Sequence, residues 1–356
     1  MTAPTNPTFL ASLVTAVAIA LAPVGAVGQD FEPFELNIIG NVANIPQSTE
    51  IERPIFEGLA EKSDGRIQVR FRTFQELGMQ GPEMARLASR GAFDIVALLG
   101  GYITGDAPFF TGVDIPGLAA SLDDAKEQAD AYREVLDQYL QAHLDTKLLT
   151  LWPYPLQILY CRVPVSSLED LRNKRIRVHG SALATLVEQI GGIAVSIPFA
   201  EVYTSLQRGV ADCAATSSVA GNTQKWYEVS SQIVTLPLGW ALSAHVANKA
   251  FWDGLEPAAR DFLAEEMVVM EQQLWDMARE RGDDALSCNM GGPCQYGTKG
   301  AMKLYRLTDD ELVEVRDIVA DSVLVNWADE CSQTYEPCVD QWSDTIGEVV
   351  GVSIRQ

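Results

Sequence analysis

The chain has 356 residues and a formal net charge of −22 at neutral pH. Such an acidic surface repels nucleic acid and anionic lipid, which argues against both as partners, and it holds an anionic solute only where a cation is placed locally. The length exceeds what one hydrophobic core usually covers, so we expect two domains.

The first 28 residues indicate a secretory signal peptide. Residues 9–27 are almost continuously apolar, carry no charged side chain and end in small residues. The apolar core, residues 10–22, is too short for a comfortable transmembrane helix, although no Lys or Arg precedes it; an uncleaved membrane anchor is the alternative. No second apolar run of membrane length follows. We therefore expect a periplasmic protein whose mature chain is not inserted in the membrane.

Short apolar strands then alternate with amphipathic helices, the pattern of an α/β fold. In the first half, a capping box formed by Ser121 and Asp124 opens a long helix. The strands and helices expected there lie at 35–40, 49–62, 66–72, 93–99, 121–144 and 147–152.

The second half repeats the alternation and ends in a longer helix that begins at Pro257. Its elements are expected at 157–163, 175–179, 182–190, 192–197, 201–208, 211–215 and 257–284. The last of these would measure roughly 42 Å, long enough to lie across both domains.

An internal echo links the two halves. Arg90-Gly91 and Arg208-Gly209 each end a predicted helix, and an Asp, Asp94 or Asp212, then opens a strand. In such a turn the glycine permits a left-handed helix cap. Although helix-glycine-strand turns are common in α/β proteins, the echo favours two similar lobes that face each other across a cleft.

Six cysteines lie beyond residue 28, and an even count in an exported chain favours disulfides. The spacing suggests the short local pairs Cys288–Cys294 and Cys331–Cys338, which leaves Cys161 and Cys213 as a long-range pair. A zinc site is the alternative, but neither short pair has CxxC spacing and the three histidines are far from both pairs in sequence.

Motifs of the common enzyme classes are missing from the sequence. We find no GxSxG, HExxH, GxxxxGK[ST] or GxGxxG pattern, so no enzyme is predicted. His143 is expected at the surface and His245 in the core. His179 follows a strand end, where α/β sheets bind ligands, and is a candidate ligand contact.

The cations of residues 171–181 are the strongest chemical signal. Alternation along the strand puts Arg175 and Arg177 on one face, and Arg177 lies near the strand's carboxyl end, before Gly180 and a helix that opens at Ser181. A guanidinium there can bind a carboxylate or sulfonate through two parallel hydrogen bonds, and free helix N–H groups point at the same anion. Pairing of Arg177 with a structural carboxylate, with Arg175 in solvent, fits the pattern equally well.

Residues 174–212 also resemble the second-domain signature of the solute receptors of TRAP (tripartite ATP-independent periplasmic) transporters. The likeness extends over nearly all of residues 35–285. The segments that carry it are Ser63-Asp64-Gly65-Arg66-Ile67, Glu76-Leu77-Gly78, Arg90-Gly91-Ala92-Phe93-Asp94-Ile95, Ile176-Arg177-Val178, Gly191-Gly192, Glu201-Val202-Tyr203, Leu206-Gln207, Gly209-Val210-Ala211-Asp212, Trp226-Tyr227-Glu228-Val229 and Ala247-Asn248-Lys249.

The resemblance implies roles for particular residues. The arginine that clamps the substrate carboxylate falls on Arg177, an aromatic residue that lines the ligand on Phe199, and a polar one near Thr216. Some members have a second arginine where this chain has Gln157, and Cys213 replaces a usual glycine. The tail, 286–356, matches less closely.

The remaining candidates for the binding site are Asn41 and three aromatic residues, Trp152, Tyr154 and Trp240. With a single cation and aromatic walls, we expect a monocarboxylate with an apolar or aromatic body; a dicarboxylate, a 2-keto acid or a sulfonate is the alternative. Ordinary core and hinge packing is the other interpretation of the aromatic residues.

Taken together, the residues and the resemblance imply two α/β lobes joined by crossing hinge strands, which close on the solute. The first lobe is expected over 30–154 and 240–281, and the second over 155–239 and 282–356. Small and large TRAP membrane subunits would be its partners, with no cofactor, no metal ion and a monomeric state expected. A receptor for a sensor kinase and, least favoured, an exported enzyme are the alternatives.

Overall fold

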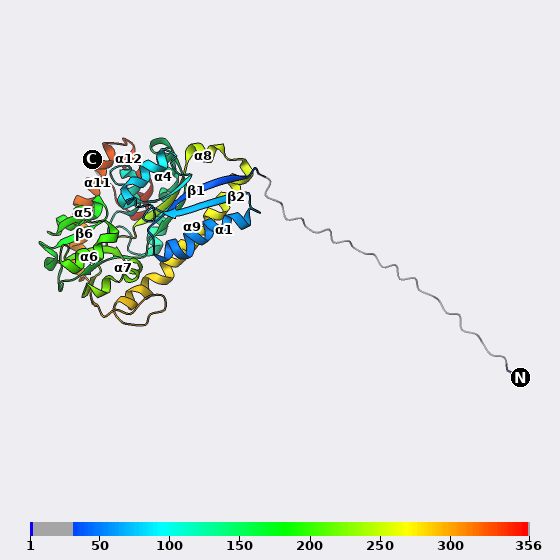
Figure 1. Ribbon diagram of the computed structural model, residues 1–356. Helices are drawn as coiled ribbons and strands as arrows, with labels where there is room; N and C mark the ends of the chain where they lie inside the picture. The colour runs from blue at the N-terminus through cyan, green and yellow to red at the C-terminus, as the bar shows by residue number, and fades with distance from the viewer. Residues whose placement is uncertain (3–30, 355–356) are drawn as a thin grey trace.

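The computed structural model describes residues 1–2 and 31–354. The expected signal peptide, 1–28, lies almost wholly outside them. The described residues form two β-sheets with helices packed around each, which Figure 1 shows as a blue and cyan part and a green part. Among these residues, no helix combines the length and the apolar character needed to span a bilayer.

The first sheet has five strands in the order β2-β1-β3-β10-β4. β1 pairs in parallel with β2 and β3, whereas β10 runs antiparallel to β3 and β4. Every residue of β3 is buried, as expected for a strand covered on both faces. The strand bounds are Phe34–Gly40 for β1, Ile67–Thr73 for β2, Ile95–Leu99 for β3, Thr146–Pro153 for β4 and Leu242–Asn248 for β10.

Helices cover this first sheet. α4 begins as predicted at the capping box, where Ser121 Oγ accepts from the Asp124 N–H at 3.1 Å and Asp124 Oδ2 accepts from the Ser121 N–H at 3.0 Å. The bounds are Arg53–Lys62 for α1, Met84–Ser89 for α2, Pro108–Thr111 for α3, Leu122–His143 for α4 and Lys249–Gly254 for α8. A short π-helical segment, η1 (Gln47–Glu52), precedes α1.

The second sheet has six strands in the order β11-β9-β5-β8-β6-β7. β8 pairs in parallel with β6 and antiparallel with β5, so both strand directions meet at its centre. The bounds are Gln157–Cys161 for β5, Arg175–Val178 for β6, Ile193–Ser196 for β7, Cys213–Ser217 for β8, Gln232–Val234 for β9 and Lys303–Tyr305 for β11. Its helices are α5 (Ser181–Gln189), α6 (Val202–Arg208), α7 (Ser218–Thr223) and α10 (Asp309–Ile318).

The predicted echo is present in both parts of the molecule. Gly91 and Gly209 adopt left-handed φ angles of 64° and 70°. Asp94 then accepts the backbone N–H of Asn37 in β1 at 2.7 Å, and Asp212 accepts that of Arg175 in β6 at 3.0 Å. Each turn therefore fixes one strand to its parallel neighbour in the same way.

Two crossing segments join the sheets, as the sequence predicted. One runs from β4 to β5 and the other from β9 to β10. They contact each other directly: the Tyr154 N–H donates to Ala241 O at 3.4 Å, and the Gln157 N–H donates to Gly239 O at 3.2 Å. The partly buried carboxylate of Asp114 also accepts from the Trp240 N–H at 3.0 Å, which ties the second crossing to the first lobe.

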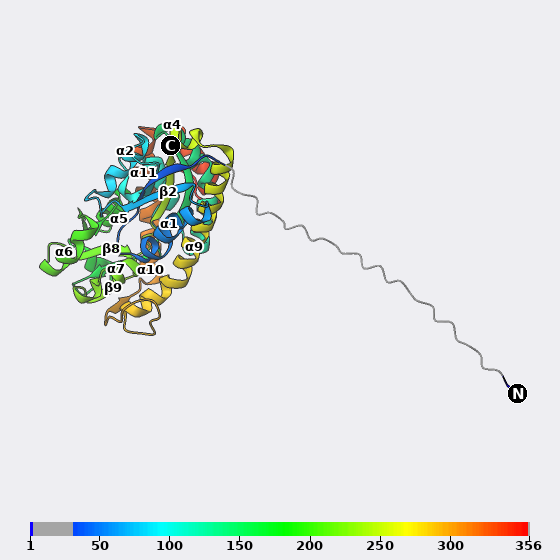
Figure 2. The ribbon, with the colours of Figure 1, turned by 45° about the vertical axis from the view of Figure 1, so that its right-hand side comes forward.

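Helix α9 (Pro257–Asn289) spans both lobes and runs along one side of the molecule (Figure 2). Trp275 Nε1 donates to Leu151 O of the first sheet at 2.9 Å, and Ser218 Oγ of the second lobe donates to Gly282 O at 2.9 Å. The helix extends past the predicted end at residue 284 to Asn289. Its 33 residues correspond to about 50 Å.

We expected residues 282–356 to belong to the second lobe, but only the first part of this tail, up to α10, does. Helix α11 (Leu324–Ser332) then packs against both α5 of the second lobe and α3 of the first, and α12 (Cys338–Trp342) and α13 (Glu348–Val350) return to the first lobe and lie near α4 (Figure 1). Trp327 Nε1 donates to Pro108 O and Trp342 Nε1 donates to Gly112 O, each at 2.9 Å. Burial of these two indoles against the first lobe explains the return.

All six cysteines are paired in the way the spacing suggested. The bridges are Cys161–Cys213, Cys288–Cys294 and Cys331–Cys338. Cys161 and Cys213 lie opposite each other in the register of β5 and β8, so the long-range bridge links adjacent strands of the second sheet.

Candidate functional site

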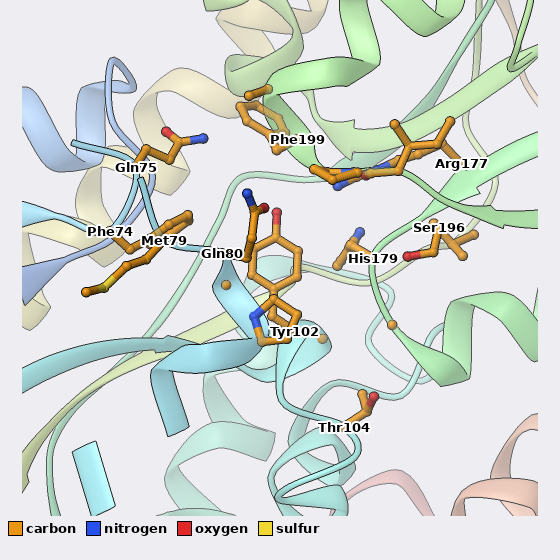
Figure 3. Close-up of a pocket in the computed structure, with 18 of the residues that line it drawn as sticks. Phe74, Gln75, Met79, Gln80, Tyr102, Thr104, Arg177, His179, Ser196 and Phe199 are labelled. Atoms are coloured by element: carbon orange, nitrogen blue, oxygen red, sulfur yellow. The ribbon is translucent and has the colours of Figure 1, made fainter. Parts of the chain in front are cut away.

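A cavity of about 970 Å³ opens between the two lobes. The first lobe contributes Tyr102 and the loop that carries Phe74, Gln75, Met79 and Gln80; the second contributes Arg177, His179, Ser196 and Phe199. Figure 3 shows Tyr102 extending toward the space bounded by Arg177, His179 and Phe199. The cavity is thus built from segments on both sides of the crossing strands.

Arg177 is held rigidly at the end of β6. Its Nε donates to Ile197 O at 3.0 Å and its Nη1 to Ala215 O at 2.8 Å, and the residue is only 2% exposed. No carboxylate of the described residues lies within ion-pair distance of it. Burial lowers the pKa of Arg177, but a guanidinium stays charged in proteins. The structure therefore presents a buried positive charge without an internal counter-ion.

Arg175 behaves differently, although it is two residues away on the same strand. Its Nη2 lies 3.0 Å from Asp212 Oδ1 and its Nε 3.1 Å from Asp212 Oδ2, and its side chain is 43% exposed. It does not line the cavity. Of the two arginines singled out in the sequence, only Arg177 is available to an anion.

His179 lies beside Arg177 and is uncharged at neutral pH. Burial, together with the positive charge of Arg177, lowers the pKa of the imidazole to about 3. Its ring packs edge-on against Tyr102, with 6.4 Å between the ring centroids. The candidate ligand contact at His179 is therefore neutral, and Arg177 supplies the positive charge.

A smaller space of about 30 Å³, the inner chamber, adjoins the cavity and shares Tyr102, Arg177, His179 and Phe199 with it. Tyr154, Gln157 and Thr216 also line it, and all three are buried. The inner chamber thus brings together six of the nine residues proposed from the sequence, namely Tyr154, Gln157, Arg177, His179, Phe199 and Thr216.

Three proposed residues do not line the cavity or the inner chamber. Trp152 is fully buried and stacks on His245, with 6.0 Å between centroids. Trp240 is 8% exposed and packs in the core around the second crossing segment. Asn41 lies behind the chamber, where it contacts the Tyr154 hydroxyl. The two tryptophans thus correspond to the core-packing interpretation, and Asn41 reaches the chamber only through Tyr154.

The sequence did not reveal the first-lobe residues that line the larger cavity, Tyr102 above all. Tyr102 follows Gly100-Gly101 directly after the buried strand β3, at the strand end where α/β sheets bind ligands. That position was a usable signal. Gln75, Met79 and Gln80 lie in an irregular loop, for which the sequence offers no comparable pattern.

One cluster of potential metal ligands is unable to bind a metal ion through its cysteines. One ligand atom each of Asp284, Cys288 and Cys294 lie within 4.8 Å of one another. The two sulfurs are joined in a disulfide, however, so neither is available as a thiolate ligand.

A family model for bacterial extracellular solute-binding proteins, family 7 (DctP), matches residues 44–324. The matched range includes the residues of both lobes that line the cavity and the inner chamber, from Phe74 to Thr216.

Two curated relatives are similar over part of their length. The ectoine-binding periplasmic protein TeaA of Halomonas elongata is 28% identical over 213 residues, which cover 56% of this chain and 59% of that protein. The C4-dicarboxylate-binding periplasmic protein DctP of Rhodobacter capsulatus is 29% identical over 141 residues, 39% of this chain and 42% of that protein. The chain therefore spans about half the length of these relatives.

Solved structures of TRAP-type receptors share the fold. DctP7 of Bordetella pertussis, an extracytoplasmic solute receptor binding pyroglutamic acid, superposes with a TM-score of 0.77 at 19% identity over 87% of this chain and 99% of its own. A TRAP periplasmic solute-binding protein from Desulfovibrio salexigens, with bound orotic acid, gives 0.78 at 17% identity over 89% and 99%. These matches confirm the two-lobed α/β fold. The matched family and structures are solute receptors, not enzymes, as expected from the missing catalytic motifs.

Proposed function

The chain belongs to bacterial extracellular solute-binding protein family 7, and on this premise we propose that it is the periplasmic solute receptor of a TRAP transporter. Export would depend on residues 1–28, and the small and large membrane subunits would receive the solute. The two crossing segments would act as the hinge on which the lobes close. The periplasmic location named for both curated relatives supports this proposal.

The ligand is a monocarboxylate. The observation that carries this is the buried guanidinium of Arg177, which has no carboxylate partner among the described residues and borders the cavity. It is the only Arg or Lys among the residues that line the cavity and the inner chamber. A second carboxylate would be desolvated without a cation, which costs several kcal/mol.

The body of the ligand is apolar or aromatic. Phe74, Met79, Tyr102 and Phe199 form walls of the cavity, and flat or apolar groups bury their surface well against such side chains. The relatives bind ligands as different as ectoine, C4-dicarboxylates, pyroglutamic acid and orotic acid. Family membership alone therefore leaves the ligand open, and the ligand class is inferred from the residues that line the cavity of this chain.

A comparison of mono- and dicarboxylates tests the proposal. We expect calorimetry on the purified mature protein to find tighter binding of aromatic or branched monocarboxylates than of succinate or malate. A thermal-shift screen would come first, since a ligand at 100 times its Kd stabilises the protein by ~2.7 kcal/mol. Tighter binding of the dicarboxylates would refute the ligand class, and binding of no acid at all would refute the receptor assignment for organic acids.

A further inference from the structure

The amide of Asn41 has a fixed orientation behind the inner chamber. The Val42 N–H donates to Asn41 Oδ1 at 2.8 Å, and because a backbone N–H can only donate, that end of the amide is the oxygen. At the other end, Asn41 Nδ2 donates to Ser243 Oγ at 2.7 Å, and the Ser243 hydroxyl donates its proton to Leu98 O at 2.7 Å. Both ends of the amide are therefore assigned by partners of known polarity.

This orientation determines the role of the Tyr154 hydroxyl. Its oxygen lies 2.8 Å from Asn41 Oδ1, and since that oxygen can only accept, the phenol donates its single proton there. Burial and the neighbouring Glu52 raise the pKa of Tyr154, so the phenol keeps this proton. A ligand in the chamber can therefore use the Tyr154 oxygen only as an acceptor.

Gln157 is oriented by a separate contact. Its Nε2 donates to Pro155 O at 3.0 Å, and a carbonyl oxygen can only accept, so the amide nitrogen is at that end. Gln157 is 3% exposed and lines the inner chamber, and its Oε1 has no hydrogen-bond partner among the described residues. The chamber therefore holds a second oxygen that accepts a hydrogen bond.

The charges around the chamber restrict the donor that these oxygens can receive. Arg177 supplies the positive charge, and no Asp or Glu lines the chamber. An ammonium group beside the ligand's carboxylate would bring a second positive charge close to Arg177, and no protein carboxylate lines the chamber to balance it. A neutral N–H or O–H group meets no such repulsion.

We propose that the inner chamber selects acids that carry a neutral hydrogen-bond donor, a hydroxyl or an amide N–H, beside the carboxylate. Arg177 binds the carboxylate, and Tyr154 and Gln157 share the single proton of the neighbouring donor. This inference rests on the proposed function, because it assumes that an organic acid enters the site. An acid with a keto oxygen or an ester oxygen at the same position offers no proton, so the oxygens of Tyr154 and Gln157 would face a third hydrogen-bond acceptor. The loss for a buried acceptor without a partner is on the order of 10- to 100-fold in affinity.

Matched pairs of ligands test the inference by calorimetry. Each pair keeps one carboxylate and one skeleton and differs in the donor: phenyllactate and phenylpyruvate, 2-hydroxyisovalerate and 2-oxoisovalerate, and pyroglutamate and its lactone, 5-oxotetrahydrofuran-2-carboxylate. We expect the donor-bearing member to bind at least tenfold more tightly in every pair that binds measurably. Equal or tighter binding of the keto acids or the lactone overturns the inference.

Two variants test whether these side chains cause the preference. Tyr154→Phe and Gln157→Met each remove one acceptor, and each should reduce the affinity ratio within a pair about 5- to 10-fold while affecting the donor-free acid least. Because Tyr154→Phe also removes the hydrogen bond to Asn41, thermal unfolding is measured for both, and Gln157→Met decides if the first variant fails to fold.

Tyr132→Phe is the matched control. Tyr132 is also a fully buried phenol, and it donates to Phe109 O at 2.9 Å, but it does not line the cavity or the inner chamber. The ratio of affinities within each ligand pair should be the same for Tyr132→Phe as for the unmodified protein. If the affinity ratios are unchanged in both Tyr154→Phe and Gln157→Met, the inference is wrong but the receptor assignment stands. If the protein binds neither the donor-bearing nor the donor-free acids, both the inference and the proposed function are wrong.

Discussion

Replacing Arg177 with alanine tests the binding site most directly. Two of the five guanidinium N–H groups are used by Ile197 O and Ala215 O, which leaves three for Tyr102 and a ligand. Removal of a buried, charge-assisted bidentate interaction costs ~3–5 kcal/mol of binding, or roughly 100-fold to several thousand-fold in Kd. Arg177→Lys should recover only part of this affinity, because an ammonium lacks the planar fork.

The assay is calorimetry with the tightest acid found in the screen, together with urea unfolding of each variant. Arg175→Ala is a matched control, since it removes the same side chain two residues away, where the guanidinium pairs with Asp212 and is 43% exposed. It should lower stability by at most ~1 kcal/mol and leave the affinity unchanged.

A folded Arg177→Ala variant with near-normal affinity would refute the clamp. An equally large decrease in the affinity of Arg175→Ala would also count against it, because the effect would then not depend on the cavity.

Three further outcomes follow from the described residues. Peptide mapping without reduction should recover Cys161 linked to Cys213, and a free thiol at either position would contradict the pairing. Because the bridge closes a loop of 52 residues, breaking it should lower the free energy of unfolding by about 4 kcal/mol. Gly101→Ala should weaken ligand binding, because the new Cβ would lie 2.7 Å from His179 Cδ2 and 2.9 Å from the His179 carbonyl oxygen, across the cleft. Gly105→Ala has open space around the new Cβ, so this control variant should bind the ligand normally in the same titration. His179 has a pKa of about 3 when folded and 6.5 when unfolded, so the stability it contributes is present above pH 6.5 and lost as the pH falls toward 3. His179→Gln should therefore lose less stability than the parent between about pH 7 and 4 in urea unfolding, and equal losses would contradict the lowered pKa.

Local pattern was sufficient for much of the fold. The Ser121 capping box, the Arg-Gly turns before Asp94 and Asp212, and the strand that carries Arg177 all depend on residues close together in the chain. Backbone sterics and hydrogen bonding over a few residues determine such features, so they can be read before any tertiary contact is known.

The aromatic residues and the tail depended on contacts between distant segments. Trp152 stacks on His245 and Trp327 donates to Pro108 O, and no periodicity in the chain specifies either partner. An apolar pattern indicates that a side chain will be buried, but it does not indicate against which element. For this reason the sequence alone could not decide whether the tryptophans lined the ligand site, or on which lobe the tail would end.

The sequence by itself indicated an α/β solute-binding protein of this family, Arg177 as a candidate anion-binding residue and the pairing of the six cysteines. Only the tertiary structure placed Tyr102 of the first lobe beside Arg177 of the second, and only the hydrogen bonds around Asn41 and Pro155 assigned Tyr154 and Gln157 as acceptors. The polarity of a hydroxyl or an amide depends on which groups surround it in space, and those groups come from parts of the chain that folding brings together.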